Sequence, residues 1–196
     1  MTVRHAPAKE RENLFLSDML DGLRDRIPLW RWYCLGMLGR HYPERAAQAV
    51  LPLLDDGEPP LRAAAARALA ASGYAQALPR LENLLQDPYA PARVAALEAV
   101  FALKCPRSLE RAQALLTDSS VAVRKTAARL LASCGHAAVP ALERACEDSH
   151  PLVRLAAARA LASCAGKSAR APLEKLSSSD PDCGVRSGVC LLLENL

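Results

Sequence analysis

Six arginines recur at nearly equal spacing along this 196-residue chain, and each has an aspartate six positions before it. Such residues could do two kinds of chemistry. A row of free guanidinium groups would bind phosphates or acidic ligands, whereas aspartates that pair with the arginines would hold neighbouring turns together. The strict pairing favours the structural role, because unpaired buried charge is too costly to repeat six times. The predicted structural ladder consists of Asp25, Arg31, Asp56, Arg62, Asp87, Arg93, Asp118, Arg124, Asp148, Arg154, Asp180 and Arg186.

The spacing of the ladder, 30 to 32 residues, indicates a repeated structural unit. A fixed period in this range is typical of stacked supersecondary units in which each repeat contacts only its neighbours. We therefore expect one solenoid over residues 10–196, preceded by a disordered tail at residues 1–9. The predicted repeats span residues 25–55, 56–86, 87–117, 118–147, 148–179 and 180–196.

Each repeat is predicted to be a pair of helices. The first helix follows the aspartate-headed turn, and the aspartate is expected to cap the N-terminus of that helix. Gly73 and Gly135 stop two of these first helices in a left-handed conformation. Second helices are expected at 76–86, 108–117, 137–147 and 168–177. A helix at about 10–24 would start the array, and 184–195 would supply only a first helix. This gives an all-α fold with about five helix pairs and a half-repeat at each end.

Composition agrees with such a fold and limits the partners. Half of the chain is apolar but only 4% is aromatic, which suits a core made of many small helix–helix contacts. The net charge of +4 is too small to argue for nucleic acid by itself. Neither a secretion signal nor an apolar run of membrane-spanning length is visible. We therefore expect a cytoplasmic protein that does not interact with membranes.

The pattern D-x-x-x-x-V-R-x-x-A-A-x-A-L, clearest at 148–161, resembles the HEAT repeat. More narrowly, it resembles the short bacterial HEAT-like repeat named for phycobilisome lyases. This resemblance implies a right-handed α-α superhelix and a bacterial origin. It also implies that the arginine-bearing first helices lie on the convex side and the second helices on the concave side.

The second helices therefore supply the predicted protein-binding residues. Their charges are of mixed sign, which suits a protein surface better than a nucleic-acid backbone, since the latter would require a uniformly basic groove. These residues are Arg80, Glu82, Asn83, Gln86, Arg111, Gln113, Glu143, Arg144, Glu147, Glu174 and Lys175.

Arg67, Arg129 and Arg159 form a second arginine set, five positions after the ladder arginines. On a helical wheel this position points away from the core, and Glu98 interrupts the stripe. A solubilising face is favoured over a basic contact surface.

An aromatic cluster lies in the first repeat, at Trp30, Trp32 and Tyr33. Such rings could mark a binding surface. We favour the alternative that they seal the end of the alanine-rich stack, because an end layer has no neighbouring repeat to close it.

Catalytic chemistry has little support in the sequence. None of the four histidines stands beside a glutamate, and His136 and His150 are expected to be caps or solvated turn residues. The seven cysteines are odd in number and contain no C-x-x-C, which favours neither a zinc site nor a disulfide framework. We therefore predict no enzymatic activity, no catalytic residue, no cofactor and no metal.

The sequence thus predicts a non-catalytic adaptor or scaffold that binds a partner protein on the concave face. Two alternatives stay open, a subunit of a bilin lyase-like enzyme and a DNA-binding HEAT-like protein. The C-terminal leucines 191–193 and Leu196 leave little polar outer face. Either a partner or a second copy of the chain covers this end, or it packs back on the preceding helix.

Overall fold

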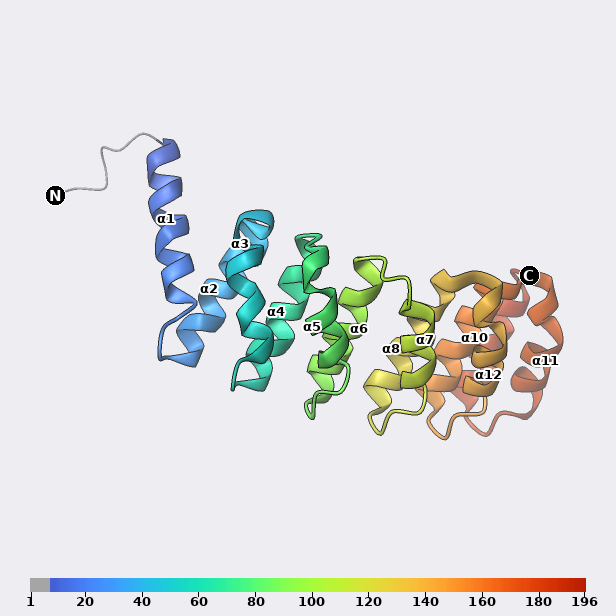
Figure 1. The fold of residues 1–196 in the computed structure, drawn as a ribbon. Helices are drawn as coiled ribbons and strands as arrows, with labels where there is room; N and C mark the ends of the chain where they lie inside the picture. The colour runs from blue at the N-terminus through green and yellow to red at the C-terminus, as the bar shows by residue number, and fades with distance from the viewer. Residues whose placement is uncertain (1–7) are drawn as a thin grey trace. The chain divides into compact units, whose positions relative to one another are not determined.

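The computed structural model describes residues 8–196, which form α-helices and short 3₁₀ helices without any β-strand. The predicted all-α solenoid fold is confirmed. The chain forms two compact units, residues 1–105 and 106–196, and in each of them the helices stack in chain order (Figure 1). A single solenoid over residues 10–196 stays a prediction. Of the predicted disordered tail at residues 1–9, residues 1–7 lie outside the described residues, and residues 8 and 9 belong to a helix.

Unit 1 contains three first helices that pack in succession, α2, α4 and α6, with the second helices α3 and α5 against them. Helix α1 packs on α2, and it begins two residues earlier than the sequence pattern predicts. The elements are α1 (Ala8–Gly22), α2 (Pro28–His41), α3 (Pro43–Val50), η2 (Leu51–Asp55), α4 (Pro59–Ala71), η3 (Ala75–Ala77), α5 (Leu78–Leu84) and α6 (Ala90–Ala102).

Unit 2 has the first helices α8, α10 and α12 and the second helices α7, α9 and α11. Helix α12 packs against both α10 and α11, although its Leu191 side chain is exposed. The elements are α7 (Ser108–Leu115), α8 (Val121–Leu131), η4 (Ala132–Ala138), α9 (Val139–Ala145), α10 (Pro151–Ala165), η5 (Gly166–Ala169), α11 (Arg170–Ser179) and α12 (Cys183–Leu193).

The core of each unit is built from alanine and leucine at fixed positions of the repeat. Ala127, Ala128 and Leu131 of α8 are fully buried. The equivalent residues of α10, Ala157, Ala158 and Leu161, are fully buried as well. Small side chains let neighbouring first helices approach closely, and the leucines fill the space between first and second helices. This packing aligns the turns that precede the first helices, and the ladder residues lie in these turns.

Every ladder arginine binds its own turn. The Nη1 atom of each arginine donates to the backbone carbonyl of the aspartate six residues earlier, at 2.6–2.9 Å. The aspartate carboxylate in turn accepts from the backbone N–H two residues after it, at 2.7–2.9 Å. Two hydrogen bonds therefore close each turn. The arginine side chain is the donor in one, and the aspartate side chain is the acceptor in the other.

The second contact joins consecutive repeats. In unit 2, the Nε and Nη2 atoms of Arg154 donate to the two carboxylate oxygens of Asp180, both at 2.7 Å. Arg62 binds Asp87 in the same two-pronged way in unit 1, and so does Arg124 with Asp148 in unit 2. In the first repeat Arg31 makes a single 3.0 Å contact with Asp56.

The aspartates do not cap the helices, contrary to the expectation from the sequence. The N–H group that each carboxylate accepts belongs to the residue at the N-cap position itself, so the bond closes an Asx-type turn just outside the helix. Side-chain caps are instead made by His150, which accepts from the N–H of Leu152, and by Asp182, which accepts from the N–H of Val185.

The aromatic cluster of α2 does not seal the stack as expected. Trp30, Trp32 and Tyr33 are 42–53% exposed, and the rings of Trp30 and Tyr33 stack on each other at 5.2 Å. The buried contacts of this layer are aliphatic, from Leu35 and Leu38 of α2, from Leu16 and Met19 of α1, and from Leu23 just after α1. Because α1 covers the aliphatic face of α2, the rings are left facing solvent.

Two helices of unit 1 end in the same way but with different residues. Gly73 has φ of 67° after α4, and Lys104 has φ of 53° after α6. In both turns the next residue donates its N–H to a carbonyl five residues back, as in a Schellman motif. Glycine tolerates this conformation, whereas the Cβ of a lysine is strained in it.

Replacing one rung should destabilise the protein. The Arg124→Ala variant leaves the half-buried carboxylate of Asp148 without its partner, which costs about 3 kcal/mol. Urea unfolding monitored by circular dichroism would measure this loss. The matched control is Arg170→Ala, whose ion pair with Glu174 is exposed and should contribute less than about 1 kcal/mol. Equal effects in the two variants would contradict a structural role of the ladder.

The ladder should also make stability depend on pH. The pKa of the Asp180 carboxyl lies below its usual value because Arg154 donates to it, although burial opposes this shift. A lowered folded-state pKa contributes stability above about pH 4, which is lost as the pH falls below that value. Urea unfolding between pH 7 and pH 3 should therefore show a shallower acid loss for Asp180→Asn than for the wild type. Parallel profiles would contradict this.

The strained turn after α6 offers a stabilising substitution. Lys104→Gly removes the Cβ from a positive-φ position and should raise the free energy of unfolding by about 1 kcal/mol. Lys104→Ala keeps the Cβ and should bring no comparable gain. Thermal unfolding of both variants tests this, and a glycine variant less stable than the wild type would refute it.

Candidate functional site

A polar groove lies beside α5 in unit 1. It has a volume of about 460 Å³, and its walls include the predicted residues Arg80, Asn83 and Gln86. Arg80 is fixed across it by an ion pair with Asp55 at 3.1 Å. The full lining is Leu54, Asp55, Asp56, Gly57, Arg62, Arg80, Asn83, Leu84, Gln86, Asp87 and Pro88. Two predicted residues of α5 and one from the turn after it are thus brought together at a hollow.

A similar groove of about 390 Å³ lies between α7 and α9 in unit 2. Its walls include the predicted residues Gln113, Arg144 and Glu147. The full lining is Gln113, Leu116, Thr117, Ala141, Arg144, Ala145, Glu147 and Asp148. We call these two hollows the second-helix grooves.

The other predicted residues line neither groove. Glu82 and Arg111 are half-buried on α5 and α7, and the Sγ atom of Cys105 lies 3.7 Å from Glu82 Oε1. Glu143, Glu174 and Lys175 are exposed on α9 and α11.

Ladder aspartates line both second-helix grooves, Asp56 and Asp87 in unit 1 and Asp148 in unit 2. The hydrogen bond from Arg62 lowers the pKa of Asp87, against the effect of burial. Burial raises the pKa of Asp148, but hydrogen bonds from Arg124 and from the N–H of His150 outweigh it and the net shift is downward. Both groups therefore stay ionised at neutral pH, and each groove has charges of both signs.

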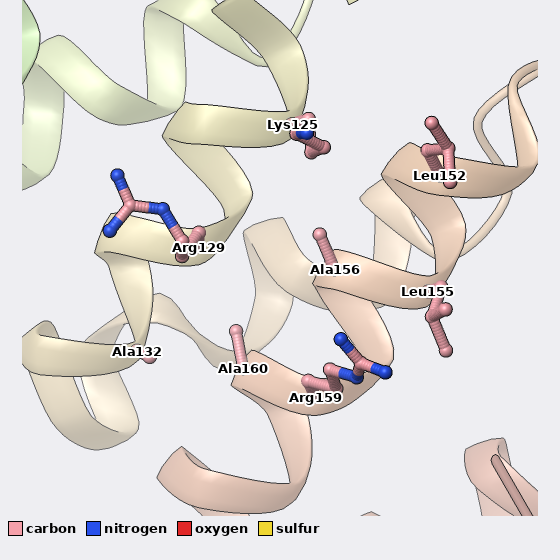
Figure 2. A pocket seen from close by; sticks show the side chains of 8 residues that line it. All are labelled: Lys125, Arg129, Ala132, Leu152, Leu155, Ala156, Arg159 and Ala160. Carbon is pink, nitrogen blue, oxygen red and sulfur yellow. The ribbon is translucent and has the colours of Figure 1, made fainter. Parts of the chain in front are cut away.

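Two further grooves lie between consecutive first helices, where sequence reasoning placed only a solubilising face. In unit 1 a groove of about 430 Å³ separates α2 from α4 and is lined in part by Trp32, Arg40 and Arg67. In unit 2 a groove of about 380 Å³ separates α8 from α10 and is lined by Lys125, Arg129, Ala132, Leu152, Leu155, Ala156, Arg159 and Ala160 (Figure 2). The two grooves share one sequence feature. An arginine lies five positions after a ladder arginine and is followed directly by an alanine.

Thiols and imidazoles do not gather into a reactive centre in the part of the chain that the structure describes. No group of three or more metal-ligating side chains occurs within residues 8–196. All seven cysteines are free thiols, and burial raises the pKa of Cys146 to about 12. A thiol with such a pKa is protonated at neutral pH and is a poor nucleophile.

Over residues 8–196, none of the helices combines the length and the apolar character needed to span a bilayer.

Several solved structures have this fold. The complex of CpcE and CpcF of phycocyanin lyase from Nostoc sp. PCC7120 contains a chain with a TM-score of 0.67 and 24% identity, covering 96% of this chain and 79% of that one. The Escherichia coli protein YibA gives a TM-score of 0.70 at 21% identity, over 98% and 77% of the two chains. A designed armadillo repeat protein in complex with the peptide (KR)4 gives 0.63 at 19% identity, over 91% and 98%.

At these identities the likeness concerns the fold. No curated protein matches the chain significantly. The family model described as HEAT repeats matches residues 16–100 and 109–194, which is most of the chain and includes the turns and helices of both units. The chain belongs to the HEAT-repeat family.

Proposed function

We propose that this protein is a non-catalytic adaptor that binds a segment of a partner protein in its second-helix grooves. The observation that carries the proposal is the recurrence of the groove. Several residues were predicted to bind a partner because they lie on the second helices. Some of them, among them Asn83 and Arg144, line a hollow of similar size in each unit. A recurring groove on a repeat protein suits an extended ligand that meets equivalent subsites.

The lining of these grooves fits a polypeptide. The amides of Asn83 and Gln86 in unit 1, and that of Gln113 in unit 2, can each donate and accept hydrogen bonds, as a peptide backbone requires. The neighbouring arginines and carboxylates favour a partner segment that also contains both charges. A designed armadillo repeat protein of similar fold has been solved in complex with a peptide, (KR)4.

The two alternatives from the sequence have weaker support. A nucleic-acid backbone would be repelled by Glu147 and Asp148 in the unit 2 groove. A role as a lyase subunit rests on the structural neighbour from phycocyanin lyase, and fold alone does not assign an activity. We further infer a bacterial, cytoplasmic protein from the repeat type and its free thiols. Self-association through α12 stays a prediction.

The test is affinity capture from lysate of the native host with matched baits. The groove variant combines Arg80→Ala, Asn83→Ala, Gln113→Ala and Arg144→Ala. The matched control changes two arginines and two glutamines outside the grooves, namely Arg24, Gln48, Gln76 and Arg170, to alanine. Both baits must retain the wild-type circular dichroism spectrum.

We expect one protein to be held by the wild type and the control and to be reduced about tenfold by the groove variant, because central polar anchors dominate binding energy. Equal retention by both variants would contradict the proposed site. Retention of nucleic acid, or of a bilin with its apo-protein, in place of a partner protein would favour one of the alternatives.

A further inference from the structure

The groove between α8 and α10 in unit 2 has a chemistry that the adaptor proposal does not use. We call it the basic groove, and its residues are shown in Figure 2: Lys125, Arg129, Ala132, Leu152, Leu155, Ala156, Arg159 and Ala160. The small side chains of Ala156 and Ala160 form its floor, and basic residues from both helices form its rim. It differs from the second-helix grooves in the sign of its charges.

The rim of the basic groove has only positive charges. Three of its eight lining residues are cationic and none is acidic. The helices α8, α10 and α12 contain no aspartate or glutamate at all. Asp118 and Asp148, the aspartates before α8 and α10, lie in the turns, and Asp148 binds the ladder arginine Arg124.

The groove also presents apolar surface. Leu152 lies at one end of the groove and is 52% exposed. Leu155 lies beside the alanine floor and is half-buried. Gly188 of α12 explains how Leu155 is held. A Cβ at Gly188 would lie 2.7 Å from Leu155 Cδ1, so the glycine lets α12 pack closely against this leucine. The result is an apolar strip between cations, which is the complement of an amphipathic acidic helix.

The arrangement recurs in unit 1. There Arg67 and Ala68 of α4 line a groove against α2, at the repeat positions that Arg159 and Ala160 hold in unit 2. Gly39 takes the place of Ala132, and Arg40 adds a second cation. A single hollow could be an accident of side-chain packing, whereas the same arginine–alanine pair beside a hollow in both units indicates a property of the repeat.

We propose that the basic groove of unit 2 binds an acidic amphipathic segment of a partner protein. Leucine or aromatic side chains of the segment lie on Ala156 and Ala160 against Leu152, and its carboxylates pair with Lys125 and Arg159. The proposal is independent of the second-helix grooves, since it uses other helices and a groove whose lining has only positive charges.

The lining favours a peptide over other polyanions. Duplex DNA presents phosphates but no apolar groups that could cover the alanine floor, and three cations release few counterions. An anionic bilayer is a flat surface, whereas the binding residues surround a concave groove. Helix-in-groove recognition combines apolar anchors at positions i, i+3, i+4 and i+7 with charges at the margins, and both are required here.

The test uses a fluorescein-labelled synthetic helix with leucines at i, i+3, i+4 and i+7 and glutamate on its other face. Its affinity for the full chain is measured by fluorescence anisotropy at low and high salt. The groove variant is Lys125→Glu with Arg159→Glu. The matched control is Lys167→Glu with Arg170→Glu, which changes the net charge equally at exposed positions of η5 and α11. Leu152→Ser tests the apolar contact at an exposed site that should not affect folding.

We expect saturable binding that weakens with salt, falls about tenfold or more in the groove variant and changes less than about twofold in the control. Leu152→Ser should weaken it about threefold, because part of the buried apolar area is lost. The proposal is overturned if the probe does not bind, or if both charge variants bind equally. It is also overturned if a glutamate peptide without leucines, a duplex DNA or anionic vesicles bind as tightly as the probe.

Discussion

The structure depends on the ladder arginine, whose guanidinium group can bind two turns at once. A ladder arginine holds the backbone carbonyl of its own turn with Nη1, and with the rest of its guanidinium it holds the carboxylate of the next turn. Arg154 shows both contacts, at 2.9 Å to the carbonyl of Asp148 and 2.7 Å to each carboxylate oxygen of Asp180. Each turn is therefore closed by its own arginine, and the turns at Asp56, Asp87, Asp148 and Asp180 are also bound by the preceding ladder arginine. The alanine positions of successive first helices are brought into line by this repeated bond.

The same arginines bear on how charge is distributed over the surface. The aspartates of unit 2 lie in the turns where the ladder arginines bind, and α8 and α10 contain no acidic residue, so the exposed charges on these two helices are all positive. The second helices have no such role, and they expose acids and bases together, as in Arg144 and Glu147 beside the unit 2 groove. The two kinds of groove thus differ in charge for a structural reason, and the two proposed ligands differ accordingly.

Much of this could be predicted from the sequence because it depends on short-range pattern. The aspartate–arginine register predicted the repeat positions, and helical periodicity placed Asn83 and Gln113 on second helices. Features set by contacts between elements were missed. A hollow between α8 and α10 depends on small residues facing each other from different repeats, at Ala132 and Ala156. The rings of Trp30 and Tyr33 are exposed because α1 covers the other face of α2, which no local pattern reveals.

Local geometry also determines two features that the sequence pattern did not predict. The ladder aspartates were expected to be helix caps, but each lies two residues before the N-cap position, and this offset decides which N–H the carboxylate receives. Lys104 has the positive φ that the pattern assigns to glycine, because the hydrogen bonds that end α6 require it whichever residue is present.

The central claim, that the arginine–aspartate contact couples consecutive repeats, is tested most directly by a double-mutant cycle. Arg62→Met, Asp87→Asn and the double variant would be unfolded in urea at neutral pH, and the coupling energy would be taken from the four unfolding free energies. The account predicts a favourable coupling of about 2 kcal/mol or more for this two-pronged, largely buried pair. A coupling near zero would show that the two side chains act independently, and the ladder would not be what holds the repeats together.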